Sequence, residues 1–351
     1  MERKQSMVYG GVVQDVYDAI ALKKPKRLPI FACSEEFDVK WHGKYTYEEM
    51  CQSGEKIAEV WIAAIEAFDY DWAWIQIDDC FEFEPLGVKC HGEENILRAT
   101  VGYLPATRET LRSLPKPNPQ TDGRMPEKLK AIRLVKEHFG DTVFIEGSCA
   151  APYSSVALLF GLEETMLLLL TEPRLLAEVC EFFVEYQSLY IQAQMEAGAH
   201  AIWLGDCNAF SGMLSLEQYH KFAFEPCKRL IEKAHESNAV IHLHNSEIEI
   251  PYLLAEVETG ADIINFGPAA DIGAVNTALR GKVCFSGNLD PIEVLMRGTP
   301  EQIEQKAERI VKVGYSGGGF LFNTGEMNPR DVPEENMLAM IQAARRTSRQ
   351  M

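Results

Sequence analysis

The chain has 351 residues, of which 46% are hydrophobic and 25% are charged, a composition typical of a soluble globular protein. Its formal net charge of -18 argues against nucleic acid or an anionic membrane surface as the main partner. No apolar run has the length of a membrane-spanning helix, and the charged N-terminus lacks the apolar segment of a signal peptide. Nine cysteines without CxxC spacing indicate free thiols, so we expect a cytoplasmic protein.

Eight short apolar runs recur along the chain, and stretches with helical periodicity separate them. Most runs are continuously apolar, as parallel strands are when helices cover one face and the other face lies inside a barrel. The runs span residues 27–33, 72–78, 142–149, 199–206, 239–245, 261–267, 282–288 and 318–325.

Start and stop signals mark the helices between these runs. Ser53 and Thr299 are expected N-caps, and Pro300 favours the first helical turn after Thr299. A leading helix is expected within residues 1–24, while the proline-rich segment 79–125 fits the alternation worst and indicates a long excursion over the barrel. Amphipathic helices are predicted over 53–68, 126–140, 173–198, 215–237, 299–314 and 332–346.

Eight strand–helix units in succession predict an α/β fold, a (β/α)8 TIM barrel with an N-terminal helical extension, formed by residues 1–351 as one domain. The active site of such a barrel lies at the carboxyl ends of its strands. Polar residues end nearly every predicted strand, although any chain turns polar where a strand ends. They are Cys33, Asp78, Asp79, Glu146, Asp206, His242, His244, Asn288, Asp290, Asn323 and Glu326.

The stretch AVIHLHNSEIE, residues 239–249, carries the most specific signal. Alternate residues of a strand point to one face, so His242 and His244 are expected side by side at the mouth of the barrel. Two imidazoles so placed favour a metal site over two core histidines, and zinc would need a third ligand.

The other strand ends give weaker signals. Asp206 could be a general base, a substrate anchor, a partner of a ligand histidine, or a turn cap. In SGNLDP, turn chemistry explains most of the motif, with Asp290 capping a short helix that starts at Pro291. Cys149 has no basic residue near it in the sequence that would activate its thiol, so we expect it to be an inert small residue.

Several stretches, taken in order, resemble the uroporphyrinogen decarboxylase superfamily. They include GSCAAPYSSVALLFG, VIHLHN, SGNLDPIEVL and PEEN, and the resemblance runs from Arg27 to the C-terminus. It implies a (β/α)8 barrel and one of two activities. One branch decarboxylates the acetate arms of a porphyrinogen without a metal, and the other consists of zinc methyltransferases that work with corrinoid proteins.

The decarboxylase branch carries an Arg-Gln-Ala-Gly-Arg stretch after its first strand, and its arginines bind the carboxylates of the substrate. Here the corresponding stretch reads FACSEEFDVKWHGKY, with Glu35, Glu36 and Asp38 and no arginine. We expect these acidic residues to repel a polyanionic porphyrinogen.

The methyltransferase branch implies a zinc shell. Its thiol-directed members have His-x-Cys at the fifth strand and a further Cys after the eighth. His242 matches the histidine, His244 replaces the first cysteine and Glu326 falls near the second, so the resemblance implies the ligands His242, His244 and Glu326. Exchanging two thiolates for these groups leaves a more positive ion, suited to polarising an oxygen.

These inferences predict a zinc-dependent methyltransferase of the O-demethylase type. It would move a methyl group from a methoxylated small molecule, such as an aromatic ether, to the Co(I) of a partner corrinoid protein. Asp206 would orient the substrate or act as acid or base, and Asn288 and Glu146 would line the site.

Several alternatives remain open. They are a metal-free decarboxylase, methyl transfer from a methylcorrinoid to tetrahydrofolate or a thiol, and a non-catalytic tetrapyrrole or corrinoid carrier. The assembly is also left open, with a homodimer as one option.

Overall fold

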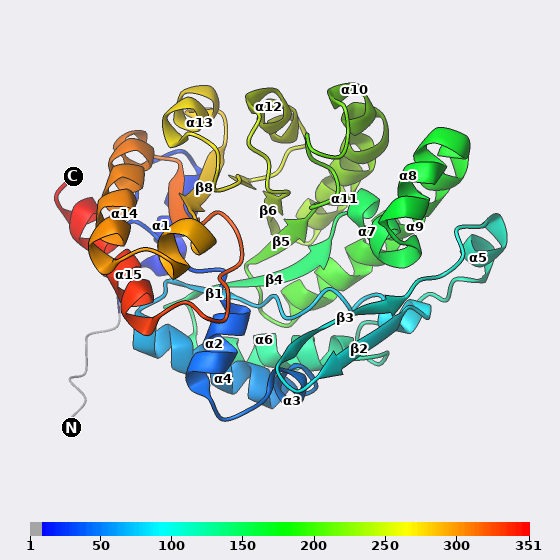
Figure 1. Cartoon of the computed structure of the whole chain (residues 1–351), viewed down its shortest axis with the longest axis horizontal. Coiled ribbons are helices and arrows are strands. Elements are labelled where there is room, and N and C mark those ends of the chain that lie inside the picture. The colour runs from blue at the N-terminus through cyan, green and yellow to red at the C-terminus, as the bar shows by residue number, and fades with distance from the viewer. Residues whose placement is uncertain (1–8) are drawn as a thin grey trace.

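The computed structural model describes residues 9–351 and contains a curled, wholly parallel sheet surrounded by helices (Figure 1). Its seven strands lie side by side in the order in which they occur along the chain, from β1 to β9. The numbering omits β2 and β3 because these two strands form a separate hairpin. The strands are β1 (Trp72–Trp74), β4 (Phe144–Ala150), β5 (Ala201–Gly205), β6 (Val240–His244), β7 (Ile263–Asn265), β8 (Cys284–Leu289) and β9 (Phe320–Thr324). They match seven of the eight predicted runs.

The first predicted strand, 27–33, is not a regular strand, so the predicted barrel is confirmed for seven strands only. Ile30 forms a single parallel bridge with Phe322 of β9. Pro29 has no N–H to donate to a ladder, which confines it to irregular or edge positions. On the β1 side, Ile30 N donates to the Asp71 carboxylate at 2.8 Å, and Ile30 O accepts from Asp71 N at 2.9 Å. A side chain therefore replaces one backbone partner where the first barrel segment meets β1.

The helices follow the predicted alternation and begin at the expected caps. Ser53 accepts from Lys56 N, and Thr299 forms a capping box with Gln302. The longer helices are α1 (Val12–Ile20), α2 (Glu35–His42), α4 (Gly54–Phe68), α6 (Met125–Phe139), α7 (Pro152–Phe160), α8 (Leu162–Thr171), α9 (Pro173–Glu196), α11 (Glu225–Glu236), α12 (Ile250–Glu258), α13 (Ile272–Leu279), α14 (Pro300–Gly314) and α15 (Glu334–Arg349).

The predicted helix over 215–237 is interrupted. It consists of α10 (Leu216–Gln218), a π-helical turn η2 (Tyr219–Phe224) and α11. Pro226 occupies the first turn of α11, where it cannot donate to a preceding carbonyl, and the wider π turn lies just before it. Short turns η1 (Glu84–Leu86), η3 (Pro291–Met296), η4 (Tyr315–Gly317) and the helices α3 (Tyr47–Cys51) and α5 (Arg108–Ser113) complete the described part.

Residues 79–125 leave the sheet after β1 and return at α6. They contain an antiparallel hairpin, β2 (Lys89–Glu93) and β3 (Ile96–Gly102), which lies beside α3 (Figure 1). This hairpin was not predicted from the sequence.

The interior of the curled sheet is apolar at the amino ends of the strands. Its side chains come mainly from the first residues of the strands, and α1 packs against them through Val12, Val16 and Ala19. Residues 1–8 of the predicted leading segment lie outside the described part. No single helix among residues 9–351 is long and apolar enough to cross a membrane, and α7 and α8 satisfy that criterion only as a pair bent by 115°.

Candidate active site

Polar side chains replace apolar ones in the carboxyl half of the barrel interior. Five of them, from β4, β6, β7 and β8, form one connected set that we call the polar layer, and all five are buried. Parallel pairing brings the strands into register, with His244 opposite Asn265 and Asn265 opposite Ser286. The polar layer consists of Glu146, His242, His244, Asn265 and Ser286.

His242 lies deep in this layer, and both of its ring nitrogens already have partners. Nδ1 lies 3.0 Å from Glu146 Oε1, and Nε2 lies 2.7 Å from Ser286 Oγ. The second oxygen of Glu146 accepts from the Trp72 indole at 2.9 Å. A metal ion could reach His242 only by replacing one of these hydrogen bonds.

His244 lies nearer the mouth, where it meets Glu326. Its Nδ1 is 2.6 Å from Asn265 Oδ1, and its Nε2 is 3.5 Å from Glu326 Oε2. Burial lowers the pKa of His244, but Glu326 and the neighbouring Cys207 outweigh burial and raise the net pKa well above its usual value. Burial alone would raise the pKa of Glu326, yet His244 and Ser246 hold that pKa below its ordinary range. The two side chains therefore favour an imidazolium–carboxylate pair.

The donor set fits zinc only in part. Among residues 9–351, no three His, Cys, Asp or Glu side chains are arranged to hold a metal ion. Of the three predicted ligands, the structure brings His244 and Glu326 together and commits both nitrogens of His242 to protein partners. The predicted three-residue shell is therefore not formed.

Asp206 follows β5 and is buried at the same end of the barrel. Ser154 donates to its Oδ1 through both its amide, at 3.2 Å, and its hydroxyl, at 2.7 Å. Burial raises the pKa of Asp206 to about 7, although the Ser154 hydrogen bonds act in the opposite direction. A carboxyl group with such a pKa can take up or release a proton near neutral pH. This property fits the predicted acid–base role.

Asn288 is buried at the carboxyl end of β8, and its amide nitrogen is bound to the backbone. Its Nδ2 donates to the carbonyl oxygens of Gly267 and Ala270, at 3.1 and 2.9 Å, and thereby holds the loop after β7. Asp290 caps η3 by accepting from Ile292 N and Glu293 N, as the turn chemistry predicted.

The acidic stretch after the first barrel segment carries less charge than the sequence indicated. Glu35 and Asp38 are buried, and burial raises the pKa of each carboxyl well above its ordinary range. Both groups therefore favour the neutral, protonated form, and the repulsion expected from their charges is reduced. Glu35 Oε2 and the amide atoms of Asn328 are buried without a hydrogen-bond partner in the described part of the chain.

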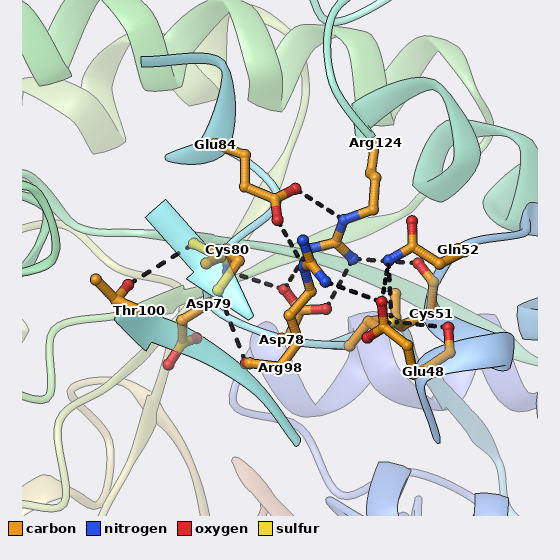
Figure 2. A network of polar contacts seen from close by, with 12 residues as sticks. Glu48, Cys51, Gln52, Asp78, Asp79, Cys80, Glu84, Arg98, Thr100 and Arg124 are labelled. Atoms are coloured by element: carbon orange, nitrogen blue, oxygen red, sulfur yellow. Dashed lines mark hydrogen bonds and ion pairs between the residues drawn. The ribbon is translucent and has the colours of Figure 1, made fainter. Parts of the chain in front are cut away.

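A second polar cluster joins the excursion to the barrel, and Figure 2 shows it from close by. Arg124 forms two hydrogen bonds of 2.9 Å with Asp78, which follows β1, and a third of 2.8 Å with Glu84. Arg98 of the hairpin donates to Glu84 at 2.6 Å and to Glu48 at 2.9 Å. We call these five residues the arginine network.

Several residues of the site were not predicted from the sequence. Ser286 and Asn265 lie inside strands that were predicted from apolar runs, and Cys207 was not singled out although it lies beside His244. Trp203 packs on both histidines, with ring centroids 4.6 Å from each. A polar residue inside an otherwise apolar strand was the available signal for Ser286 and Asn265.

Comparison with known proteins places this barrel in a family. The model of uroporphyrinogen decarboxylase (URO-D) matches residues 14–347. The chain belongs to the URO-D family. It is similar to curated uroporphyrinogen decarboxylases from Koribacter versatilis, 26% identical over 84% of this chain and 83% of the relative, and Geobacter metallireducens, 25% identical over 87% and 88%.

Solved structures support the fold. A methyltransferase from Methanosarcina mazei has a TM-score of 0.86 at 19% identity, covering 95% of this chain and 98% of that chain. A B12-independent methionine synthase from Shewanella has a TM-score of 0.56 at 11% identity, covering 86% and 89%. At these identities the likeness concerns the fold.

Proposed function

We propose that this protein is a methyltransferase that moves a methyl group from a methoxylated compound to the Co(I) of a partner corrinoid protein. The similar fold of the Methanosarcina mazei methyltransferase supports methyl transfer, whereas the curated relatives are decarboxylases. The side chains around the site must therefore decide between the two activities.

The observation that carries the proposal is that the arginine and lysine side chains around the ends of β1 and β9 already have partners within the protein. Arg98 and Arg124 are bound by protein carboxylates. Arg330 donates to the Asn95 carbonyl at 2.6 Å, and Lys128 donates to the Ser148 carbonyl at 2.9 Å. A porphyrinogen brings several carboxylates that need cationic partners. Because Arg98 and Arg124 already have carboxylate partners within the protein, they favour a substrate with few charges.

Neutral polar groups near the mouth suit such a substrate. Within residues 9–351, the Asn328 amide and the Glu35 carboxyl have buried atoms without a hydrogen-bond partner, and each unmade hydrogen bond costs about 1–3 kcal/mol. A hydroxyl group of a methoxylated compound could donate to or accept from these atoms. The aromatic face of Trp203, beside both histidines, could pack on a ring.

In the proposed reaction, the methyl carbon leaves the ether oxygen and binds cobalt. Both electrons of the new Co–C bond come from Co(I), while the C–O pair stays on the oxygen, which takes a proton to become a hydroxyl group. Asp206, with a pKa of about 7, can supply that proton. A methyl ether has a poor leaving group, so protonation of the departing oxygen lowers the barrier.

Zinc and the partner's docking place are separate parts of the proposal. His244 and Glu326 would hold zinc, with at least one further ligand, and the bound ion would supply Lewis-acid polarisation of the ether oxygen. The corrinoid protein would dock at the carboxyl ends of the strands, because cobalt must reach the methyl group directly.

The test uses the purified protein with 2-methoxyphenol and free cob(I)alamin in place of the partner. We expect methylcobalamin and catechol in equal amounts, followed by the cobalamin absorption spectrum and by chromatography. Asp206→Asn should lower kcat by about 100-fold, because the proton donor is lost. Release of CO2 from a porphyrinogen, without demethylation of any methoxylated probe, would overturn the proposal in favour of decarboxylation.

A further inference from the structure

The polar layer is a continuous chain of hydrogen bonds from the closed interior to the mouth of the barrel. We propose that His242 is a positioning residue in this chain, held with its proton on Nδ1, and not a metal ligand. The inference rests on the proposed function only in taking the mouth of the barrel as the reaction site. It assigns to His242 a role different from the one that the family resemblance implied.

The inner end of the chain has a fixed direction. The Trp72 indole N–H can only donate, and it donates to Glu146 Oε2. The other carboxylate oxygen, Oε1, lies 3.0 Å from His242 Nδ1 and accepts a proton from it. An imidazole with one N–H then has an unprotonated Nε2, so the Ser286 hydroxyl, at 2.7 Å, must donate to that nitrogen.

The outer end is fixed independently by a backbone group. The Ser286 carbonyl oxygen can only accept, and Asn265 Nδ2 donates to it at 3.3 Å. The same amide nitrogen donates to Ser286 Oγ at 3.1 Å. The Asn265 oxygen must therefore face His244, whose Nδ1–H donates to it at 2.6 Å. This arrangement directs His244 Nε2 toward Glu326 at the mouth.

The two halves meet at Ser286, which accepts from Asn265 and donates to His242. Each of these hydrogen bonds thus joins one donor to one acceptor, as buried networks require. The chain explains why two histidines on one face of β6 differ: His244 presents a nitrogen to the mouth, whereas His242 fixes the hydroxyl and amide behind it. Metal-bound or catalytic imidazoles are commonly oriented by such partners.

The direct test is the ring-nitrogen spectrum of the whole protein labelled with 15N-histidine. Long-range 15N–1H correlations distinguish an Nδ1–H imidazole from an Nε2–H imidazole, and loss of one signal set in His242→Gln assigns His242. We expect His242 as the Nδ1–H form, unchanged when Zn²⁺ is added. A wild-type His242 in the Nε2–H form, or a shift of its nitrogens caused by Zn²⁺, would overturn the proposal.

Glu146→Gln provides a second, directional test. The glutamine oxygen can accept from Trp72, but its NH2 group then faces His242 Nδ1, which must accept, so the proton moves to Nε2. We expect His242 to switch to the Nε2–H form and kcat to fall about ten-fold, with KM changed less than about two-fold. An unchanged His242 spectrum in a folded Glu146→Gln protein would contradict the proposed direction.

Glu256→Gln is the matched control, because Glu256 is an equally buried glutamate that bonds to Asn245 outside the polar layer. This variant should leave the His242 spectrum and kcat unchanged. The ring-nitrogen spectra need no substrate, so failure of the proposed methyl transfer would leave this inference standing. Conversely, an Nε2–H form of His242 in an active methyltransferase would remove the inference alone.

Discussion

The arginine network and the polar layer are built from different chemistry. The arginine network consists of full charges, with the guanidinium groups of Arg98 and Arg124 placed between the carboxylates of Asp78, Glu84 and Glu48 (Figure 2). The polar layer consists of imidazole, hydroxyl and amide groups around one carboxylate, and its outer end meets Glu326. The first cluster fastens the excursion to β1, while the second presents a nitrogen to the mouth. Ion pairs anchor a segment, and directional hydrogen bonds orient a reactive group.

The largest effect is expected from breaking the arginine network. Arg124→Met leaves the fully buried carboxylate of Asp78 without its counter-ion and should lower the free energy of unfolding by about 3–5 kcal/mol. Urea unfolding monitored by tryptophan fluorescence measures the change. The control is Arg108→Met, which removes an exposed ion pair with Glu178 and should cost less than about 1 kcal/mol. Equal losses in the two variants would refute an anchoring role for the network.

A smaller effect, which depends on pH, is expected beside the polar layer. The folded-state pKa of Asp206, about 7, lies above its ordinary value, so between pH 4 and 7 the folded state binds more protons than the unfolded state. Asp206 therefore contributes stability below pH 4 that is lost as the pH rises to 7, by at most about 1.4 kcal/mol per pH unit. Asp206→Asn should remove this part of the slope. Parallel pH–stability curves for the two proteins would show that Asp206 titrates normally.

Ser286→Ala should have the smallest effect of the three. The change removes the donor to His242 Nε2 and the acceptor of Asn265, and leaving such buried groups unpaired costs about 1–3 kcal/mol. Thermal and urea unfolding measure it. Ser188→Ala, which removes an exposed hydroxyl bonded to a carbonyl of its own helix, should stay within about 0.5 kcal/mol. A loss as large as that of Arg124→Met would erase the energetic contrast between the clusters.

Local signals were sufficient to predict much of the fold. Seven apolar runs became strands, and the caps at Ser53 and Thr299 formed as predicted, because a cap depends on residues three positions away. The segment 27–33 was misjudged because its irregular form depends on the Asp71 side chain, some 41 residues along the chain. The β2–β3 hairpin was missed because its strands are exposed and half-buried in alternation and carry no continuous apolar run.

The candidate site was predictable in position but not in connectivity. Strand alternation placed His242 and His244 on one inner face, and both side chains are buried there. Their partners could not be read from the sequence, since Glu146 is 96 residues from His242 and the pairing depends on the register of neighbouring strands. The ligand set implied by resemblance assumed equivalent histidines, whereas packing makes them different.

The junction between the first barrel segment and β1 has a consequence for the order of assembly during translation. Asp71, which substitutes for a strand partner of Ile30, is held by Arg27 at 2.9 Å and by Arg345 of α15 at 2.5 Å. Arg345 also donates to the Leu28 carbonyl at 2.8 Å. Since α15 follows every other described helix along the chain, Arg345 can bind Asp71 only after those helices have been synthesised. Before that point, Arg27 is the one of these two arginines that Asp71 can bind.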